Sequence, residues 1–190
     1  LEVDLEAIRD RLLEHPLVKS ATVRRKLPSE IVVEIVERTP AAVVLDGRRF
    51  VVDLEGYVMA LPQEGSTALP CLQGLAVEGR RIAGKDLQDL ADGIGIIAAI
   101  RDAGFPKLSS LECIDLGRSS DAVLIPRSGR PLIHVGRRNV ALRLERWKSV
   151  VRDMAERWDE IEYVDLRAEG MVVAKPQPPE EDAGSDKGDG

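Results

Sequence analysis

The chain has 190 residues, of which 44% are hydrophobic and only 3% aromatic, and its formal net charge is −6. This length allows one ordinary domain or two small ones, and the apolar share excludes disorder of the whole chain and predicts an aliphatic core. Nucleic-acid binders neutralise phosphates with a basic surface, so the acidic balance argues against that class of function, although it leaves room for a local basic patch.

Residues 4–40 are predicted to form a helix followed by a strand hairpin. Asp4 is a good N-cap, and the apolar residues after it recur at helical spacing until Pro16 stops the helix. Alternating residues over 21–26, a turn, and the β-branched run 31–37 then indicate two antiparallel strands.

The next region is dominated by strand signals. Two strands, over 41–45 and 48–53, flank Asp46-Gly47, a strong hairpin signal, and a short strand follows over 57–61. Residues 62–85 contain several Gly and Pro and are predicted to form loops.

Two helices are predicted in the remaining chain. The first has Asp86 as its N-cap and ends near Gly104, and Gly93 and Gly95 weaken it by about 1 kcal/mol each relative to Ala. The second, over 137–158, has the clearest amphipathic pattern. It is also rich in Arg, and a solvated charged face is favoured over a membrane-facing or phosphate-facing surface.

Short strands surround these helices, and the chain ends in a polar tail. The strands are predicted over 111–116, 122–126, 131–135, 163–167 and 171–175. From residue 176 to 190 the sequence has no apolar residues large enough to build a core, so we predict a disordered tail.

Few residues suggest chemistry. Neither His15 nor His134 has a second His or Cys at metal-ligand spacing, so no metal or cofactor is predicted. We predict that the chain is not an enzyme. The alternative is an enzyme that uses Cys113 and His134 as a nucleophilic pair. Cys71 and Cys113 allow one disulfide, but two separate buried thiols are favoured, because apolar residues flank both.

One segment resembles a known family. His15 to Val43 is similar to the end of a POTRA domain, and more closely to that of the bacterial cell-division protein FtsQ, called DivIB in Gram-positive bacteria. That family has the pattern P-x-V-x-x-A-x-V-x-R-x-x-P-x-x-L-x-V-x-V-x-E-R-x-P-x-A, with Ile31 at its Leu position here. Four later segments resemble family motifs in the same order: Phe50 to Val58 (lvD-x-x-G-x-v), Leu69 to Gly74 (LP-x-L-x-G), Ile133 to Gly136 (i-x-l-G) and Val164 to Arg167 (vDLR).

The resemblance implies an α+β fold, with a truncated POTRA module over residues 1–40 and a mostly antiparallel β domain with two helices over 41–175. A POTRA domain normally opens with a strand and a further helix. Because the chain begins with Leu1 rather than Met, we expect these elements, a cytoplasmic tail and a single transmembrane helix to precede it. The fragment is then expected on the periplasmic side of the inner membrane, at the division septum.

The resemblance also implies a scaffold that recruits the bitopic division proteins FtsB and FtsL, with an FtsB-type partner adding a strand to the last strand of the β domain. The expected partner-binding residues lie in and before that strand: Arg167, Ala168, Gly170, Met171, Val172, Val173, Ala174 and Lys175. Arg167 is expected to pair with an acidic partner residue. Ala168 stands where the family often has an aromatic residue, so that ring contact is expected to be absent. The alternative is a POTRA-bearing outer-membrane assembly or secretion factor. Neither reading involves nucleic acid or a small-molecule substrate.

Overall fold

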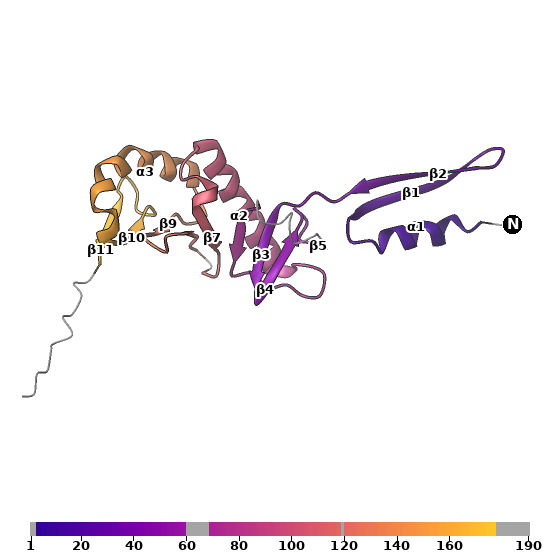
Figure 1. Ribbon diagram of the computed structural model, residues 1–190, viewed down its shortest axis with the longest axis horizontal. Helices are drawn as coiled ribbons and strands as arrows, with labels where there is room; N and C mark the ends of the chain where they lie inside the picture. Colours follow the sequence, from indigo (N-terminus) through magenta and orange to yellow (C-terminus); the bar gives the residue numbers. More distant parts are fainter. Residues whose placement is uncertain (1–2, 60–68, 119, 178–190) are drawn as a thin grey trace, which may run out of the picture.

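The computed structural model of the protein describes residues 3–59, 69–118 and 120–177. Its strands form two sheets, one of two strands and one of nine, and helices accompany both. Figure 1 shows the small sheet at the N-terminal end of an elongated molecule and β11 at the opposite end. The predicted α+β class is confirmed.

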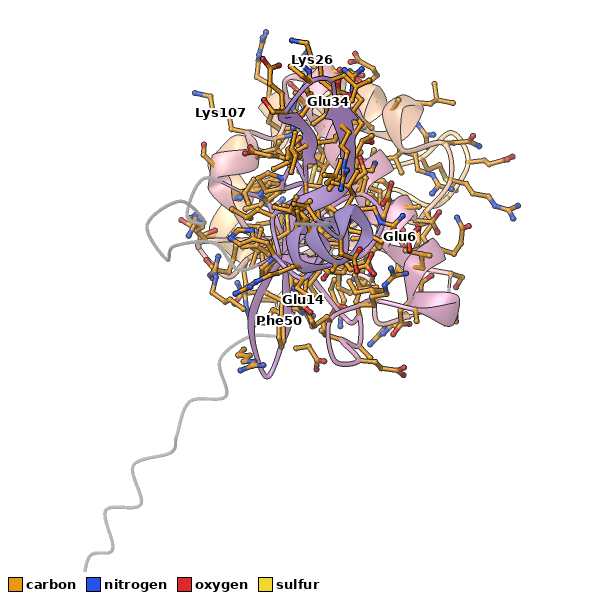
Figure 2. The ribbon with its side chains drawn as sticks, turned by 90° about the vertical axis from the view of Figure 1, so that its right-hand side faces the viewer. Glu6, Glu14, Lys26, Glu34, Phe50 and Lys107 are labelled. Atoms are coloured by element: carbon orange, nitrogen blue, oxygen red, sulfur yellow. A yellow bond between two sulfur atoms is a disulfide. The ribbon has the colours of Figure 1, made fainter. Side chains whose placement is uncertain are left out.

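The N-terminal module consists of three elements: α1 (Leu5–Leu13), β1 (Val18–Lys26) and β2 (Glu30–Glu37). The Asp4 side chain caps α1 as predicted, because its Oδ1 accepts hydrogen bonds of 3.0 Å from the backbone N–H groups of Glu6 and Ala7. β1 and β2 pair antiparallel over most of their length. Figure 2 views the molecule from this end and shows charged side chains, including Lys26 and Glu34, spread around it.

The second sheet contains all the remaining strands, and its order is β11-β10-β9-β8-β7-β6-β3-β4-β5. The elements of this part are β3 (Ala42–Asp46), β4 (Arg48–Val52), β5 (Val58–Met59), β6 (Cys71–Gln73), α2 (Gly84–Ala103), η2 (Leu108–Ser110), β7 (Leu111–Asp115), β8 (Val123–Pro126), β9 (Leu132–His134), α3 (Val140–Met154), η3 (Ala155–Glu160), β10 (Ile161–Asp165) and β11 (Val173–Pro176). The pairs β3–β6, β6–β7 and β9–β10 are parallel, and the other neighbours are antiparallel.

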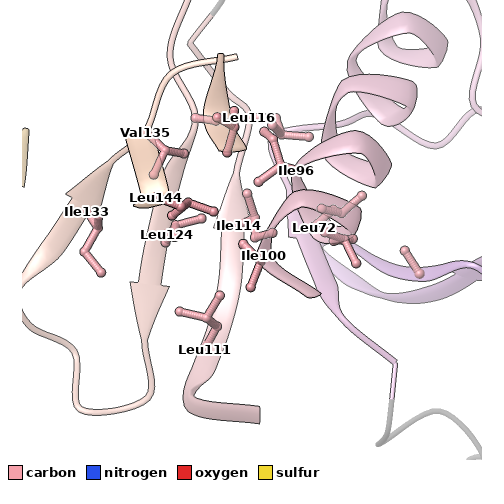
Figure 3. Close-up of a cluster of buried hydrophobic side chains, with 14 of the residues drawn as sticks. Leu72, Ile96, Ile100, Leu111, Ile114, Leu116, Leu124, Ile133, Val135 and Leu144 are labelled. Carbon is pink, nitrogen blue, oxygen red and sulfur yellow. The ribbon is translucent and has the colours of Figure 1, made fainter. Parts of the chain in front are cut away.

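An aliphatic core lies between this sheet and its two helices. Alternate strand residues such as Leu72, Ile114 and Leu124 are fully buried, and α2 and α3 bury Ile96 and Leu144 against them. Figure 3 shows these side chains meeting between α2 and the sheet. The composition predicted such a core, and the amphipathic stripe of α3 is confirmed as its inner face.

The structure corrects several predicted boundaries near α2. The predicted loop over 62–85 contains β6, which lies in the middle of the sheet between β3 and β7. α2 begins at Gly84 with Ala83 as its N-cap, so Asp86 is not the cap. Instead the Asp86 carboxylate lies in the first turn of the helix and accepts a 2.8 Å hydrogen bond from the N–H of Ala76. The predicted end at Gly104 is confirmed by its left-handed φ of 65°.

Later boundaries also differ from the prediction. α3 is shorter than expected, since 137–139 precede it and η3 follows Met154. The last strand was predicted over 171–175, but β11 covers Val173–Pro176, so Pro176 belongs to the sheet and not to the tail. The rest of the predicted tail, 178–190, lies outside the described residues, as does the end of the strand predicted over 57–61.

The structure joins Cys71 and Cys113 in a disulfide, so the prediction of two separate thiols is wrong. The sulfur atoms meet because β6 and β7 are parallel neighbours whose register places Leu72 opposite Ile114. Sequence reasoning had not recognised β6 as a strand, and it therefore had no means of placing the two cysteines side by side.

An ion pair joins the two sheets. Arg38 follows β2, and its Nη1 donates a 2.6 Å hydrogen bond to Asp53 Oδ2, with both side chains at most 10% exposed. The Arg38 guanidinium also stacks 3.8 Å from the centre of the Tyr57 ring. The other Asp53 oxygen accepts the N–H groups of Glu55 and Tyr57. Arg38 therefore fixes the turn between β4 and β5 of the large sheet to the end of the small one.

Replacing Arg38 by Ala is expected to lower the free energy of unfolding by about 3–5 kcal/mol, because it leaves the buried Asp53 carboxylate without its cation. Arg24→Ala breaks the exposed pair with Glu34 and is the control, with an expected cost below about 1 kcal/mol. Urea unfolding measures both. Equal losses in the two variants would contradict the role of Arg38.

The two glycines of α2 are expected to respond oppositely to Ala. A Cβ on Gly93 would lie 2.8 Å from Leu116 Cδ1 and 3.0 Å from Leu72 Cδ1, whereas a Cβ on Gly95 would meet open space. Gly95→Ala should therefore raise the free energy of unfolding by about 1 kcal/mol through helix propensity. Gly93→Ala should lower it by about 1 kcal/mol or more through overpacking. Thermal unfolding distinguishes the two, and stabilisation by both would show that Gly93 has no packing role.

Candidate partner-binding edge

The large sheet has two ends that differ in how they are covered. Beyond β5 the chain segment 78–82 supplies further pairing, because Val58 N–H donates to Arg80 O at 3.0 Å and Ile82 N–H donates to Gly56 O at 2.7 Å. At the other end, β11 pairs with β10 on one side, and no described strand pairs with its outer side. β11 is therefore the open edge of the described sheet.

The backbone of β11 alternates between β10 and the outside. Gln177 N–H donates to Glu160 O at 2.7 Å, so residues 173, 175 and 177 direct their backbone groups towards β10. Val172, Ala174 and Pro176 then direct theirs outwards. Because Pro176 has no N–H, the outer donors are those of Val172 and Ala174.

The side chains of β11 alternate between the two faces of the sheet. Val172 packs against the main core, and Ala174 and Pro176 line a hollow beside the end of α3. Val173 and Lys175 lie on the opposite face, where they are paired with Asp165 and Tyr163. The predicted separation of Val172 and Ala174 from Val173 is confirmed, but Met171 lies in the preceding loop.

Two arginines of α3 fix this loop. Arg146 Nη1 donates to Ala168 O at 2.7 Å and to Met171 O at 3.0 Å. Arg143 donates to Val135 O at 2.7 Å and to Arg167 O at 3.3 Å. The prediction of a merely solvated arginine face is thus wrong for Arg143 and Arg146, which bind backbone carbonyls. Their presence at the edge was not predicted because carbonyl contacts leave no sequence pattern.

Arg167 is held within the chain. Its guanidinium donates to both oxygens of Asp165, at 2.9 and 2.6 Å, and to Asp121 Oδ2 at 2.9 Å. The hydrogen bonds from Arg167 lower the pKa of Asp165, and the same contacts raise the pKa of Arg167. Its side chain is still 42% exposed, so pairing with an acidic partner stays a prediction.

Arg137 was predicted as one of the arginines of a solvated helix face, and that prediction is wrong for it as well. Its side chain is only 8% exposed and pairs with the buried carboxylate of Asp89 on α2. It also donates to the carbonyl oxygens of Leu116 at 2.5 Å and Arg118 at 3.1 Å, in the connection from β7 to β8. One guanidinium thus ties together α2, this connection and the segment before α3.

A hollow of about 590 Å³ opens beside these groups. Its lining includes four arginines from separate positions: Arg137, Arg138, Arg143 and Arg167. The ion pairs of the described residues neutralise two of them, Arg137 and Arg167, and none involves Arg138 or Arg143. Arg138 and Arg143 are therefore the two arginines of the hollow that have no carboxylate partner among the described residues.

The alternative catalytic pair does not form. Cys113 is in the disulfide, so it offers no thiol. His134 Nδ1 instead lies 2.7 Å from Asp121 Oδ2, and His15 Nδ1 accepts the N–H of Leu17 at 3.3 Å. Across the described ranges, no three His, Cys, Asp or Glu side chains gather as a metal site would require. None of the helices seen there combines the length and apolarity needed to cross a bilayer.

The fold and its motifs define the class of protein as a POTRA-type module followed by an α+β domain. The FtsQ-type POTRA domain family matches residues 1–38, and the C-terminal domain family of cell division protein FtsQ/DivIB matches residues 41–167. The chain belongs to the FtsQ/DivIB family of cell-division proteins. This membership decides against an outer-membrane assembly or secretion factor.

Relatives agree with this membership. The cell division protein FtsQ of Salinibacter ruber is 28% identical over 180 residues, covering 90% of this chain and 69% of its own length. The cell division protein FtsQ of Koribacter versatilis is 26% identical over 183 residues, covering 92% of this chain and 51% of its own length. A shorter match, to FtsQ of Novosphingobium aromaticivorans, is 40% identical over 92 residues, 47% of this chain and 28% of that protein. The chain thus spans between about half and about two thirds of the two longer matches.

The lowered pKa of Asp165 predicts a component of acid stability. The ionised Asp165 carboxylate contributes its full stabilisation above pH 3.8, the ordinary pKa of the carboxyl group. This stabilisation is lost as the pH falls from there through the lower pKa of the folded state. Asp165→Asn should therefore flatten the loss of stability below about pH 4. Asp102→Asn, at an exposed position near the end of α2, is the control. Urea midpoints at several pH values measure the effect, and parallel pH profiles for wild type and Asp165→Asn would refute it.

Proposed function

We propose that this chain is a non-enzymatic scaffold of the division machinery that holds an FtsB-type partner, and with it FtsL, by adding a partner strand to β11. The observation that carries the proposal is that no described strand pairs with the outer side of β11, in a sheet whose other end is covered. An added strand gains main-chain hydrogen bonds from the edge and specificity from alternate side chains.

The arginine-lined hollow supports the same proposal. A partner strand that runs along β11 past Val172 reaches the loop fixed by Arg146, and Arg138 and Arg143 stand beside it without carboxylate partners in the described chain. Acidic partner residues would satisfy that charge, and Arg167 would contribute with its exposed part. We therefore expect an acidic residue in the partner next to its pairing strand.

Ala168 has no ring with which to contact a partner, and the loop around it is held through its backbone. Ala168 offers a carbonyl bound to Arg146, and Gly170 has a left-handed φ of 71° that the turn requires. Arg167, Ala168, Gly170 and Met171 thus shape the start of the edge, while Val172 to Lys175 supply the edge itself. We propose that affinity here depends more on the backbone of β11 than on a ring.

The position of the chain in the cell is part of the proposal. A disulfide such as Cys71–Cys113 persists in oxidising compartments, which supports a periplasmic location for this part. We propose that a helix preceding this chain anchors the full-length protein in the inner membrane at the septum. We also propose that residues 1–40 and 41–175 are its two extracytoplasmic domains, since their strands form separate sheets.

Ala174→Pro tests the proposal, because it removes an outer donor while residues 173, 175 and 177, whose backbone groups are directed towards β10, stay unchanged. We expect it to weaken binding of a peptide from the extracytoplasmic part of the FtsB-type protein by about tenfold or more. Ala174→Ser keeps the N–H and is the matched control. Calorimetric titration measures both, with circular dichroism to verify folding. Wild-type affinity in a folded Ala174→Pro variant would sink the proposal.

A further inference from the structure

Ala174 and Pro176 of β11 line a second hollow, which is distinct from the arginine-lined one. It measures about 350 Å³ and lies between the end of α3 and the outer strands. Its apolar lining comes from Met154 at the end of α3, Ile161 at the start of β10, and Ala174 and Pro176 on β11. Figure 1 shows that α3 and η3 overhang the sheet at this end, above β10 and β11.

The small size of Ala174 leaves this space open. On the same side of the sheet, Val172 fills its place against the core, whereas Ala174 contributes a single methyl group. A strand added to β11 would lie about 4.8 Å away, and every second side chain of it would point to the α3 side. One of those side chains would stand directly beside the hollow.

We propose that this hollow is a side-chain pocket that takes one large apolar residue, such as Leu, Ile or Phe, from the added partner strand. The inference rests on the proposed function. It extends it, because it assigns a specificity pocket to the α3 side of the edge and states the chemistry of the partner residue that enters it.

The segment next to β11 in the sequence, residues 178–190, offers no occupant of this kind, because it contains only Pro, Glu, Asp, Ala, Gly, Ser and Lys. A second copy pairing edge to edge would bring its own Ala174 and Pro176 to the pocket, and these are too small to fill it. Arg157 and Glu160 also line the pocket and form a 2.9 Å ion pair with each other. Asp153 adds a carboxylate to the lining, but the groups of the pocket that β11 and β10 contribute, Ala174, Pro176 and Ile161, are apolar.

Filling the pocket from within tests this inference. Ala174→Trp and the milder Ala174→Leu keep the backbone donor but occupy the space, and we expect about tenfold or greater weakening of the FtsB-type peptide. Leu45→Trp, on the remote strand β3, is the control for a bulky substitution and should bind as wild type. Circular dichroism and thermal unfolding verify that each variant is folded.

An alanine scan of the peptide identifies the residue that enters. One large apolar residue should cost about tenfold when truncated against wild type and almost nothing against Ala174→Trp. Wild-type affinity of folded Ala174→Trp and Ala174→Leu, with Ala174→Pro still impaired, would overturn the pocket but keep the docking edge. Wild-type affinity of all three would overturn both.

Two further outcomes would overturn the inference by assigning the pocket to another occupant. Tighter peptide binding after truncation of the chain at Gln177 would assign it to the chain's own tail. A dimer of the protein that Ala174→Trp disperses would assign it to a second copy.

Discussion

The buried guanidinium of Arg137 is the contact on which the geometry of the edge depends. It satisfies the Asp89 carboxylate inside α2 and at the same time binds carbonyl oxygens of the connection from β7 to β8. That connection carries Asp121, whose carboxylate receives Arg167 and contacts His134. The position of the final hairpin is therefore set through a chain of charge-assisted hydrogen bonds that begins far from β11 in sequence. A lysine could not replace Arg137, because one ammonium group lacks the flat fork that reaches all these acceptors.

The two sheets show two different uses of arginine. At the junction, Arg38 makes a single strong contact to Asp53 and stacks on Tyr57, which fixes one module against the next. At the C-terminal end, Arg143 and Arg146 bind backbone carbonyls, and neither forms an ion pair with a described residue. The family motifs contain the ion-paired residues Arg38, Asp53, Asp165 and Arg167, but neither Arg143 nor Arg146. Their pattern therefore reflects polar contacts between elements as much as it reflects the core.

The sequence predicted the elements that have strong periodicity. It did not predict those that depend on pairing with segments far away in the chain. α1, the β1–β2 hairpin and the inner face of α3 follow from capping and spacing, which are local. β6 has three residues, too few to show a period, and its identity comes from parallel neighbours on both sides. The disulfide was lost with it. The last hairpin was predicted, and the family resemblance directed attention to its outer strand. The contacts of Arg137 and the pocket beside Ala174 were not predicted, because both are assembled from residues far apart in the chain.

Pro176 closes β11 and carries a further consequence. An edge strand with a full row of outward donors is a template for uncontrolled pairing, and proteins of this kind risk aggregating through it. Here the row is cut to two donors by a proline at one end and by the arginine-bound loop at the other. The edge is thus long enough to receive one short strand in one register, and too short to seed a growing sheet. The same residue that limits the length of strand that could pair with β11 also limits pairing between copies of the protein.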